Sequence, residues 1–170
     1  ADWLLDLLAA LDATDVTLIG HSMGSLIALQ AAATAPARIA RLALVGSVVP
    51  MPVAAPLLDS TLSNRDAAHA MINQWSYTTA SRLGASSVPG LNLTALNERL
   101  MQRQAAGVLH RDMAACNAWS GGFDAAARVA CPVLLLASAQ DRMTPPKAMA
   151  PLAGAFTGGA TVSRVILPDA

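Results

Sequence analysis

The first part of this chain contains segments with two different patterns of apolar residues, one typical of helices and one typical of buried strands. Apolar residues recur at helical spacing over residues 2–11, and a continuous apolar run over 16–19 is typical of a buried strand that ends at Gly20. An alanine-rich segment at 23–34 predicts a second helix, and residues 41–46 form a second buried run. Strand, helix and strand in this order make a βαβ unit, which predicts a parallel sheet with helices on both faces.

The same pattern returns near the end of the chain. Residues 133–138 form a strongly apolar run, and Pro146 stands where a helix begins, because proline is favoured in the first helical turn. A last strand is predicted over 162–167. The fold class is therefore α/β, with a mostly parallel sheet flanked by helices.

The middle of the chain follows a different pattern. Pro50, Pro52 and Pro56 are expected to break any regular element at its start, and no apolar run of strand length follows for about eighty residues. Helices are predicted instead over 64–75, with Asn64 as the cap, over 93–105 and over 111–119. We interpret this region as a helical cap inserted into the α/β domain. The expected division is 1–47 for the first part of the core, 48–129 for the cap and 130–170 for the second part of the core.

Charge and composition restrict the partners. The chain has 11 basic and 11 acidic residues, a pI near 7.0 and a mean hydropathy of +0.46, so it lacks the basic patch of a nucleic-acid binder and the polybasic run of a membrane-surface protein. Residues 16–37 carry no charged side chain, and Gly20 and Gly24 stand at GxxxG spacing. However, a helix spanning a membrane would have to bury the polar side chains of this segment without partners. These include His21, Ser22, Ser25 and Gln30, and Pro36 also lies within the segment. We expect no nucleic acid and no membrane as partners.

The two cysteines match no metal or redox motif. Cys116 and Cys131 are too far apart for CxxC, and we expect both to behave as small buried hydrophobes in a reducing cytoplasm. The first residues carry Asp2 where a secretory leader would carry Lys or Arg, and there is no initiator Met. The oligomeric state is left open, and we expect neither a metal nor a cofactor.

One pentapeptide carries the chemistry. Gly20-His21-Ser22-Met23-Gly24 is a G-x-S-x-G motif between a predicted strand and a predicted helix, which is the context of a nucleophile elbow. The glycines on either side are expected to remove Cβ atoms that would clash in the tight turn. The backbone N–H of Met23, at the helix N-terminus, is then the candidate donor to an oxyanion.

Two segments resemble the α/β-hydrolase fold superfamily. The segment VTLIGHSMGSLIALQAAATAPARIARLALVGSVVP is similar to its nucleophile strand, elbow, helix and next strand, and CPVLLLASAQDRMTPP to the later strand and acid-bearing loop. The resemblance implies that Ser22 is the nucleophile of a serine hydrolase and that Asp141 is the triad carboxylate. The two occur in the order of the family, serine before aspartate.

The resemblance also implies where the base lies. Members of this superfamily carry the catalytic histidine after the last strand, so it is expected just after Ala170. The earlier strands, with the second oxyanion N–H, are not found either, so we expect a fragment that is inactive by itself. His69 and His110 precede Asp141, against the order of the fold, and remain alternatives for the base. His21 adjoins the nucleophile and is expected to pack beside the elbow.

The residues predict a substrate class and leave three functions open. The expected function is hydrolysis of an ester-like small molecule through an acyl-enzyme, and the alternatives are an acyltransferase or cofactor-free perhydrolase, or a non-catalytic binding protein of the same fold. Large apolar residues in the middle region could line a pocket for an apolar part of the substrate, or could be core. These residues are Met71, Trp75, Tyr77, Met101, Met113, Trp119 and Phe123.

Overall fold

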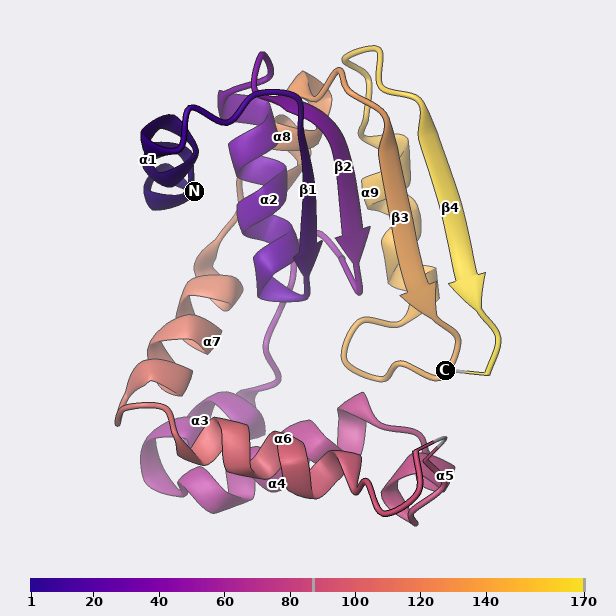
Figure 1. The fold of residues 1–170 in the computed structure, drawn as a ribbon. Helices are drawn as coiled ribbons and strands as arrows, with labels where there is room; N and C mark the ends of the chain where they lie inside the picture. Colours follow the sequence, from indigo (N-terminus) through magenta and orange to yellow (C-terminus); the bar gives the residue numbers. More distant parts are fainter. Residues whose placement is uncertain (87, 170) are drawn as a thin grey trace. The chain divides into compact units, whose positions relative to one another are not determined.

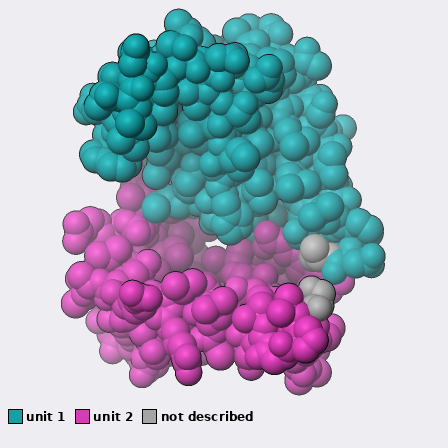
Figure 2. Space-filling model, in the orientation of Figure 1, with its two compact units in different colours: residues 1–51, 119–139, 144–169 teal, residues 52–118, 140–143, 170 magenta. Residues whose placement is uncertain are grey.

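The computed structural model describes residues 1–86 and 88–169, and these fall into two compact units (Figures 1 and 2). The sheet unit comprises residues 1–51, 119–139 and 144–169, and the helical unit comprises residues 52–118 and 140–143. Each unit has its own core and is described by itself below.

The sheet unit is built on four parallel strands in the order β1-β2-β3-β4 (Figure 1). Because every neighbouring pair is parallel, the carboxyl ends of all four strands lie at one edge of the sheet. In α/β proteins, functional groups gather at this edge. The strands are β1 (Val16–His21), β2 (Ile39–Val45), β3 (Val133–Ser138) and β4 (Val162–Leu167).

Helix α2 (Met23–Thr34) packs on β1, β2 and α8 (Gly122–Arg128), and its alanine-rich face is buried against them. Small side chains let the helix approach the sheet closely, and larger residues fill the space between. The large side chains with the least exposure in this core include Leu29, Ile39, Leu42, Leu44, Leu135 and Leu152. The other helical elements of the unit are α1 (Asp2–Ala10), η1 (Pro146–Met149) and α9 (Ala150–Gly154).

The sheet is covered on one face within the described residues, rather than on both as predicted. Thr17, Ile19 and His21 alternate along β1 and are all exposed, Ile19 to 68% of its surface. Arg41 on β2 is exposed as well. Since alternate residues of a strand point to opposite faces, the helices of this unit bury only the other face.

The helical unit contains α3 (Ala55–Ser63), α4 (Arg65–Ser76), α5 (Thr79–Arg82), α6 (Leu93–Gln102) and α7 (Val108–Ala118). Its core is formed by Leu57, Ala68, Ile72 and Met101. Asn64 caps α4 by accepting a hydrogen bond from the Ala67 amide at 3.1 Å, as the sequence predicted.

Several expected boundaries differ from those in the structure. Pro56 lies in the first turn of α3, so it begins a helix where we expected the prolines to prevent one. Residues 119–129 group with the sheet unit because α8 packs on α2. The helix predicted after Pro146 is divided into η1 and α9, and Pro151 stands in the first turn of the second piece.

Among the described residues, no helix is both long and apolar enough to cross a lipid bilayer.

Candidate active site

Ser22 occupies a strained turn between a strand and a helix. It follows His21, the last residue of β1, and occupies the N-cap position of α2, which begins at Met23, without a capping bond from its side chain. Its backbone has φ 52° and ψ −126°, a combination that L-residues rarely adopt. Such a conformation costs about 1–3 kcal/mol and persists only where its surroundings enforce it.

Close packing at Gly20 is one part of that enforcement. A Cβ atom at Gly20 would lie 2.4 Å from the carbonyl oxygen of Gly24, so the end of β1 can approach the first turn of α2 only without a side chain. At Gly24, in contrast, a Cβ would meet no described atom within 4 Å. The expectation that both glycines avoid a clash is therefore wrong for Gly24.

Main-chain hydrogen bonds complete the turn. The Ser22 amide donates to the carbonyl oxygen of Val45 at 2.9 Å, so the residue stays tied to the end of β2 after the strand pairing has finished. Met23 is the first residue of a 12-residue helix, and an amide at this position has no partner within its own helix. The helix dipole also favours negative charge here. The turn thus places a half-buried hydroxyl beside an N–H that can receive an oxyanion.

Asp141 lies three residues after the end of β3, in a segment that groups with the helical unit. Its Oδ1 accepts a hydrogen bond from the Met143 amide at 2.8 Å. The Arg142 amide donates to the carbonyl oxygen of Trp75 at 3.4 Å, and Met143 packs against the helical core. The structure therefore gathers Gly20, Ser22, Met23 and Gly24 within one unit, and does not bring Asp141 into that unit.

The three histidines lie in different surroundings. His21 is exposed, so the expectation that it packs beside the elbow is not met. His110 Nδ1 lies 2.8 Å from the hydroxyl oxygen of Thr61, and His69 is fully buried in the helical unit. In the described part of the chain, no hydrogen bond joins a histidine to Ser22.

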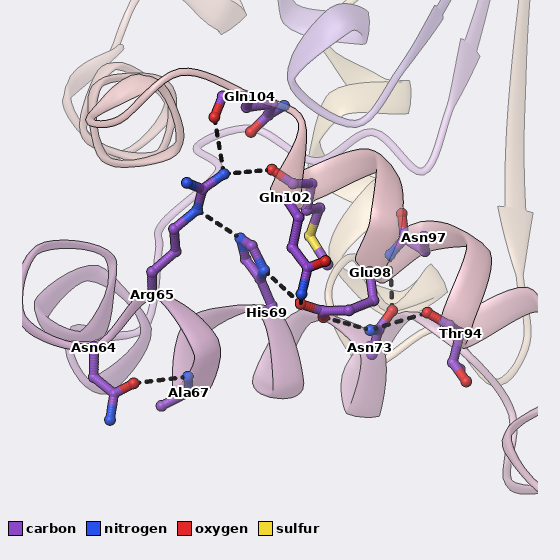
Figure 3. Close-up of polar contacts among 11 residues, drawn as sticks. Asn64, Arg65, Ala67, His69, Asn73, Thr94, Asn97, Glu98, Gln102 and Gln104 are labelled. Atoms are coloured by element: carbon purple, nitrogen blue, oxygen red, sulfur yellow. Dashed lines mark hydrogen bonds and ion pairs between the residues drawn. The ribbon is translucent and has the colours of Figure 1, made fainter.

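His69 sits at the centre of a polar network between α4 and α6 (Figure 3). Its Nδ1 lies 2.9 Å from Glu98 Oε1, and Arg65 Nε donates to its Nε2 at 3.4 Å. Because the guanidinium is always a donor, Nε2 must be the acceptor, so the ring proton lies on Nδ1 and points to the carboxylate. Arg65 also donates from Nη2 to the carbonyl oxygens of Met101 and Gln104, at 2.7 and 2.9 Å.

Three residues of this region have the spacing of metal ligands. One ligand atom each of Asp66, His69 and Glu98 lie within 4.8 Å of one another. However, Arg65 occupies His69 Nε2 and fixes the proton on the nitrogen that faces Glu98. In this structure His69 and Glu98 are therefore members of a hydrogen-bond network rather than free ligands. Sequence reasoning missed it, although the i, i+3 spacing of Asp66 and His69 on a helix was a usable signal.

The large apolar residues of the middle region mostly form core. Met71, Trp75, Met101 and Met113 pack in the core of the helical unit. An open depression of about 400 Å³ in this unit is lined by five polar or charged residues and two alanines. Its lining comprises Ala70, Asn73, Gln74, Arg82, Thr94, Ala95 and Glu98.

Neither cysteine has the character of a nucleophile. Neither of these described cysteines forms a disulfide, and Cys116 is buried whereas Cys131 is partly buried. Burial raises the pKa of the Cys116 thiol, with a further contribution from the Asp112 carboxylate, and burial also raises the pKa of Cys131. Raised pKa values keep both thiols protonated at neutral pH, which makes them weak nucleophiles.

Comparison with known proteins agrees with this architecture. A family model described as the alpha/beta hydrolase fold matches residues 1–67. No curated protein sequence matches the chain.

Solved structures match almost the whole chain. A hydrolase from Pseudomonas aeruginosa is 21% identical, with a TM-score of 0.79 over 99% of this chain and 62% of its own. An esterase from Exiguobacterium antarcticum is 16% identical, with a TM-score of 0.81 over 98% of this chain and 63% of its own. A bromoperoxidase from Bacillus anthracis is also 16% identical, with a TM-score of 0.78 over 96% and 63%. The chain thus spans less than two thirds of the length of these proteins.

Proposed function

We propose that this chain, which has the α/β-hydrolase fold, contributes the nucleophile and the acid of a serine hydrolase that acts on ester-like small molecules. The observation that carries the proposal is the backbone of Ser22, with φ 52° at a strand-to-helix turn that only a glycine at position 20 allows. Strain of this kind is rarely kept in a turn without a function.

In the proposed reaction, Ser22 Oγ attacks the substrate carbonyl and transfers its proton to a histidine. The carbonyl oxygen gains negative charge, which the Met23 N–H and the dipole of α2 stabilise. The alcohol leaves with the proton from the histidine, and a water molecule, activated by the same histidine, then releases the acyl group from Ser22.

We assign the base to a histidine outside these 170 residues and the acid to Asp141. His69 has both ring nitrogens engaged in the helical unit, and His110 bonds Thr61. The position of Asp141 just after β3 supports its role, because the carboxyl ends of β1 and β3 share one edge of the sheet.

The decisive experiment uses the longest natural protein that contains this sequence. It should react with a fluorophosphonate probe and hydrolyse a p-nitrophenyl ester, and Ser22→Ala should abolish both. Ser63→Ala is the matched control, because Ser63 is an exposed serine at the end of α3. Labelling that survives in Ser22→Ala would overturn the proposal. A wild-type protein that neither labels nor hydrolyses esters would favour a binding protein instead.

Asp141→Asn separates catalysis from structure. An asparagine Oδ1 can still accept the hydrogen bond from the Met143 amide, so the turn should persist. Loss of the carboxylate should reduce kcat by a factor on the order of 10³–10⁴, as expected for a triad acid. An unchanged kcat would leave Asp141 with only its role in the turn.

The second candidate function is transfer of the acyl group to an acceptor other than water. The likeness to a bromoperoxidase favours this candidate. In such a reaction, hydrogen peroxide would replace water as the group that attacks the acyl-enzyme. Formation of a peracid from hydrogen peroxide and a short-chain ester, measured with Ser22→Ala as the blank, distinguishes the two.

A further inference from the structure

Two buried hydroxyl groups lie next to the turn that contains Ser22. Ser25, in the first turn of α2, is 0% exposed, and Ser47, just after β2, is 2% exposed. Their oxygen atoms are 2.8 Å apart. A buried hydroxyl is costly unless it is hydrogen-bonded, so this pair needs a further acceptor.

That acceptor is the nucleophile's own carbonyl group. Ser25 Oγ donates to the carbonyl oxygen of Ser22 at 2.5 Å, and the Ser25 amide donates to the same oxygen at 2.8 Å. A hydroxyl has only one proton to donate, so the proton between the two hydroxyls comes from Ser47. The resulting series of hydrogen bonds runs from the Ser47 hydroxyl through the Ser25 hydroxyl to the carbonyl oxygen of Ser22.

This series of hydrogen bonds fixes the orientation of the Met23 N–H as well as that of the Ser22 carbonyl group. The Ser22 C=O and the Met23 N–H belong to one planar trans peptide unit and therefore point in opposite directions. Holding the oxygen toward the buried hydroxyls turns the Met23 N–H away from them. Val45 holds the Ser22 amide from the other side, at 2.9 Å, and Ser47 follows Val45 by two residues. The end of β2 thus secures both sides of the strained residue.

We propose that Ser25 and Ser47 are positioning residues that aim the Met23 N–H at the oxyanion. This inference rests on the proposed function, since it assigns the Met23 amide to the oxyanion hole. The two hydroxyl groups hold the peptide unit between Ser22 and Met23 in its observed orientation. Without them, the strained backbone would relax and this peptide unit would rotate. The main effect falls on the charged transition state, whereas binding of the neutral substrate is little changed.

The test removes the hydroxyls one at a time in the longest natural protein that contains this sequence. Ser25→Ala should lower kcat for p-nitrophenyl acetate about tenfold to a hundredfold and leave KM nearly unchanged, because a small misplacement of an oxyanion donor has effects of this size. At position 47, Thr and Val have nearly the same shape and differ by the hydroxyl. Ser47→Val should lower kcat, and Ser47→Thr should restore most of it.

A second measurement does not depend on activity. In the 170-residue chain, Ser25→Ala should accelerate amide hydrogen exchange in peptides covering residues 22–26 without changing exchange in β3. If Ser25→Ala does not fold, the comparison of Ser47→Val with Ser47→Thr decides by both readouts. Equal kcat and equal exchange for these two variants would overturn the inference.

The failure of this inference is distinguishable from failure of the proposed function. If Ser22→Ala abolishes turnover while Ser25→Ala and Ser47→Val keep the wild-type kcat, only the positioning role is wrong. If Ser22→Ala retains turnover, the proposed function is wrong, and this inference with it.

Discussion

The elbow of the sheet unit and the His69 network of the helical unit hold polar groups in place in two different ways. At the elbow, backbone contacts fix the turn. Gly20 lies against the first turn of α2, and a main-chain hydrogen bond joins the Ser22 amide to the carbonyl oxygen of Val45. Around His69, side chains from α4 and α6 bond one another across 29 residues of sequence (Figure 3). The first arrangement leaves no room for a side-chain atom at Gly20, whereas the second depends on complementary donors and acceptors.

The largest effect is expected at Gly20. Gly20→Ala places a Cβ 2.4 Å from a backbone oxygen that cannot move without unwinding α2, so unfolding free energy should fall by about 3 kcal/mol. Gly24→Ala is the matched control. Its Cβ meets no described atom within 4 Å, and alanine is favoured over glycine in a helix by up to about 1 kcal/mol.

Urea unfolding of the two variants measures the difference. Equal stability of Gly20→Ala and Gly24→Ala would show that α2 can shift away from β1, and would remove the packing argument for the strained elbow.

This contrast explains which parts of the molecule could be predicted from the sequence. The strands at 133–138 and 162–167 and the helix at 23–34 are confirmed with the expected bounds, because apolar runs and turn residues within a few positions determine them. The α/β-hydrolase fold is confirmed as well. It could be predicted because the elbow motif is local and its residue spacing encodes a turn.

The features that sequence reasoning missed depend on residues far apart in the chain. The pairing of His69 with Glu98 follows from how two helices pack, which no local pattern encodes. Helix α3 was missed because Pro56 was taken as a breaker, although proline is also a good first residue of a helix. The catalytic roles of Ser22 and Asp141 remain predictions that the experiments above test.

The next largest effect is expected in the His69 network. His69→Ala leaves Glu98 Oε1 and Arg65 Nε without their buried partner, and should lower stability by about 2 kcal/mol. Gln102→Ala removes another donor to the same Glu98 oxygen, at 2.9 Å, but on the exposed side, so it should cost less than about 0.5 kcal/mol.

Thermal unfolding, with hydrogen exchange of peptides from α4 and α6, checks this pair. Similar losses for both variants would mean that burial adds nothing to the network, and that the helical unit is held by its apolar core alone.

A smaller effect is expected at the cap of α4. Asn64→Ala removes the acceptor for the Ala67 amide and should cost about 1 kcal/mol, whereas Asn64→Asp keeps an acceptor oxygen and should stay close to wild type. Chemical denaturation measures both variants. A loss as large in Asn64→Asp as in Asn64→Ala would place the contribution of Asn64 outside the capping bond.

The smallest effect concerns pH and the thiol of Cys116 in α7. Burial and the Asp112 carboxylate raise its pKa in the folded chain, so above the ordinary thiol pKa of about 8.5 the unfolded chain ionises first. The resulting stability is present below that pH and is lost as pH rises toward the folded pKa.

Two measurements follow from this sign. Between pH 7 and 10, unfolding free energy should decrease less in Cys116→Ala than in wild type. At pH 8, iodoacetamide should modify Cys116 more slowly than Cys131, because Cys131 is only partly buried and no carboxylate contributes to its raised pKa. Faster alkylation of Cys116 would mean that the helical unit opens locally around α7 more often than the sheet unit opens around Cys131. That result would extend the contrast between the elbow and the His69 network to the units that contain them.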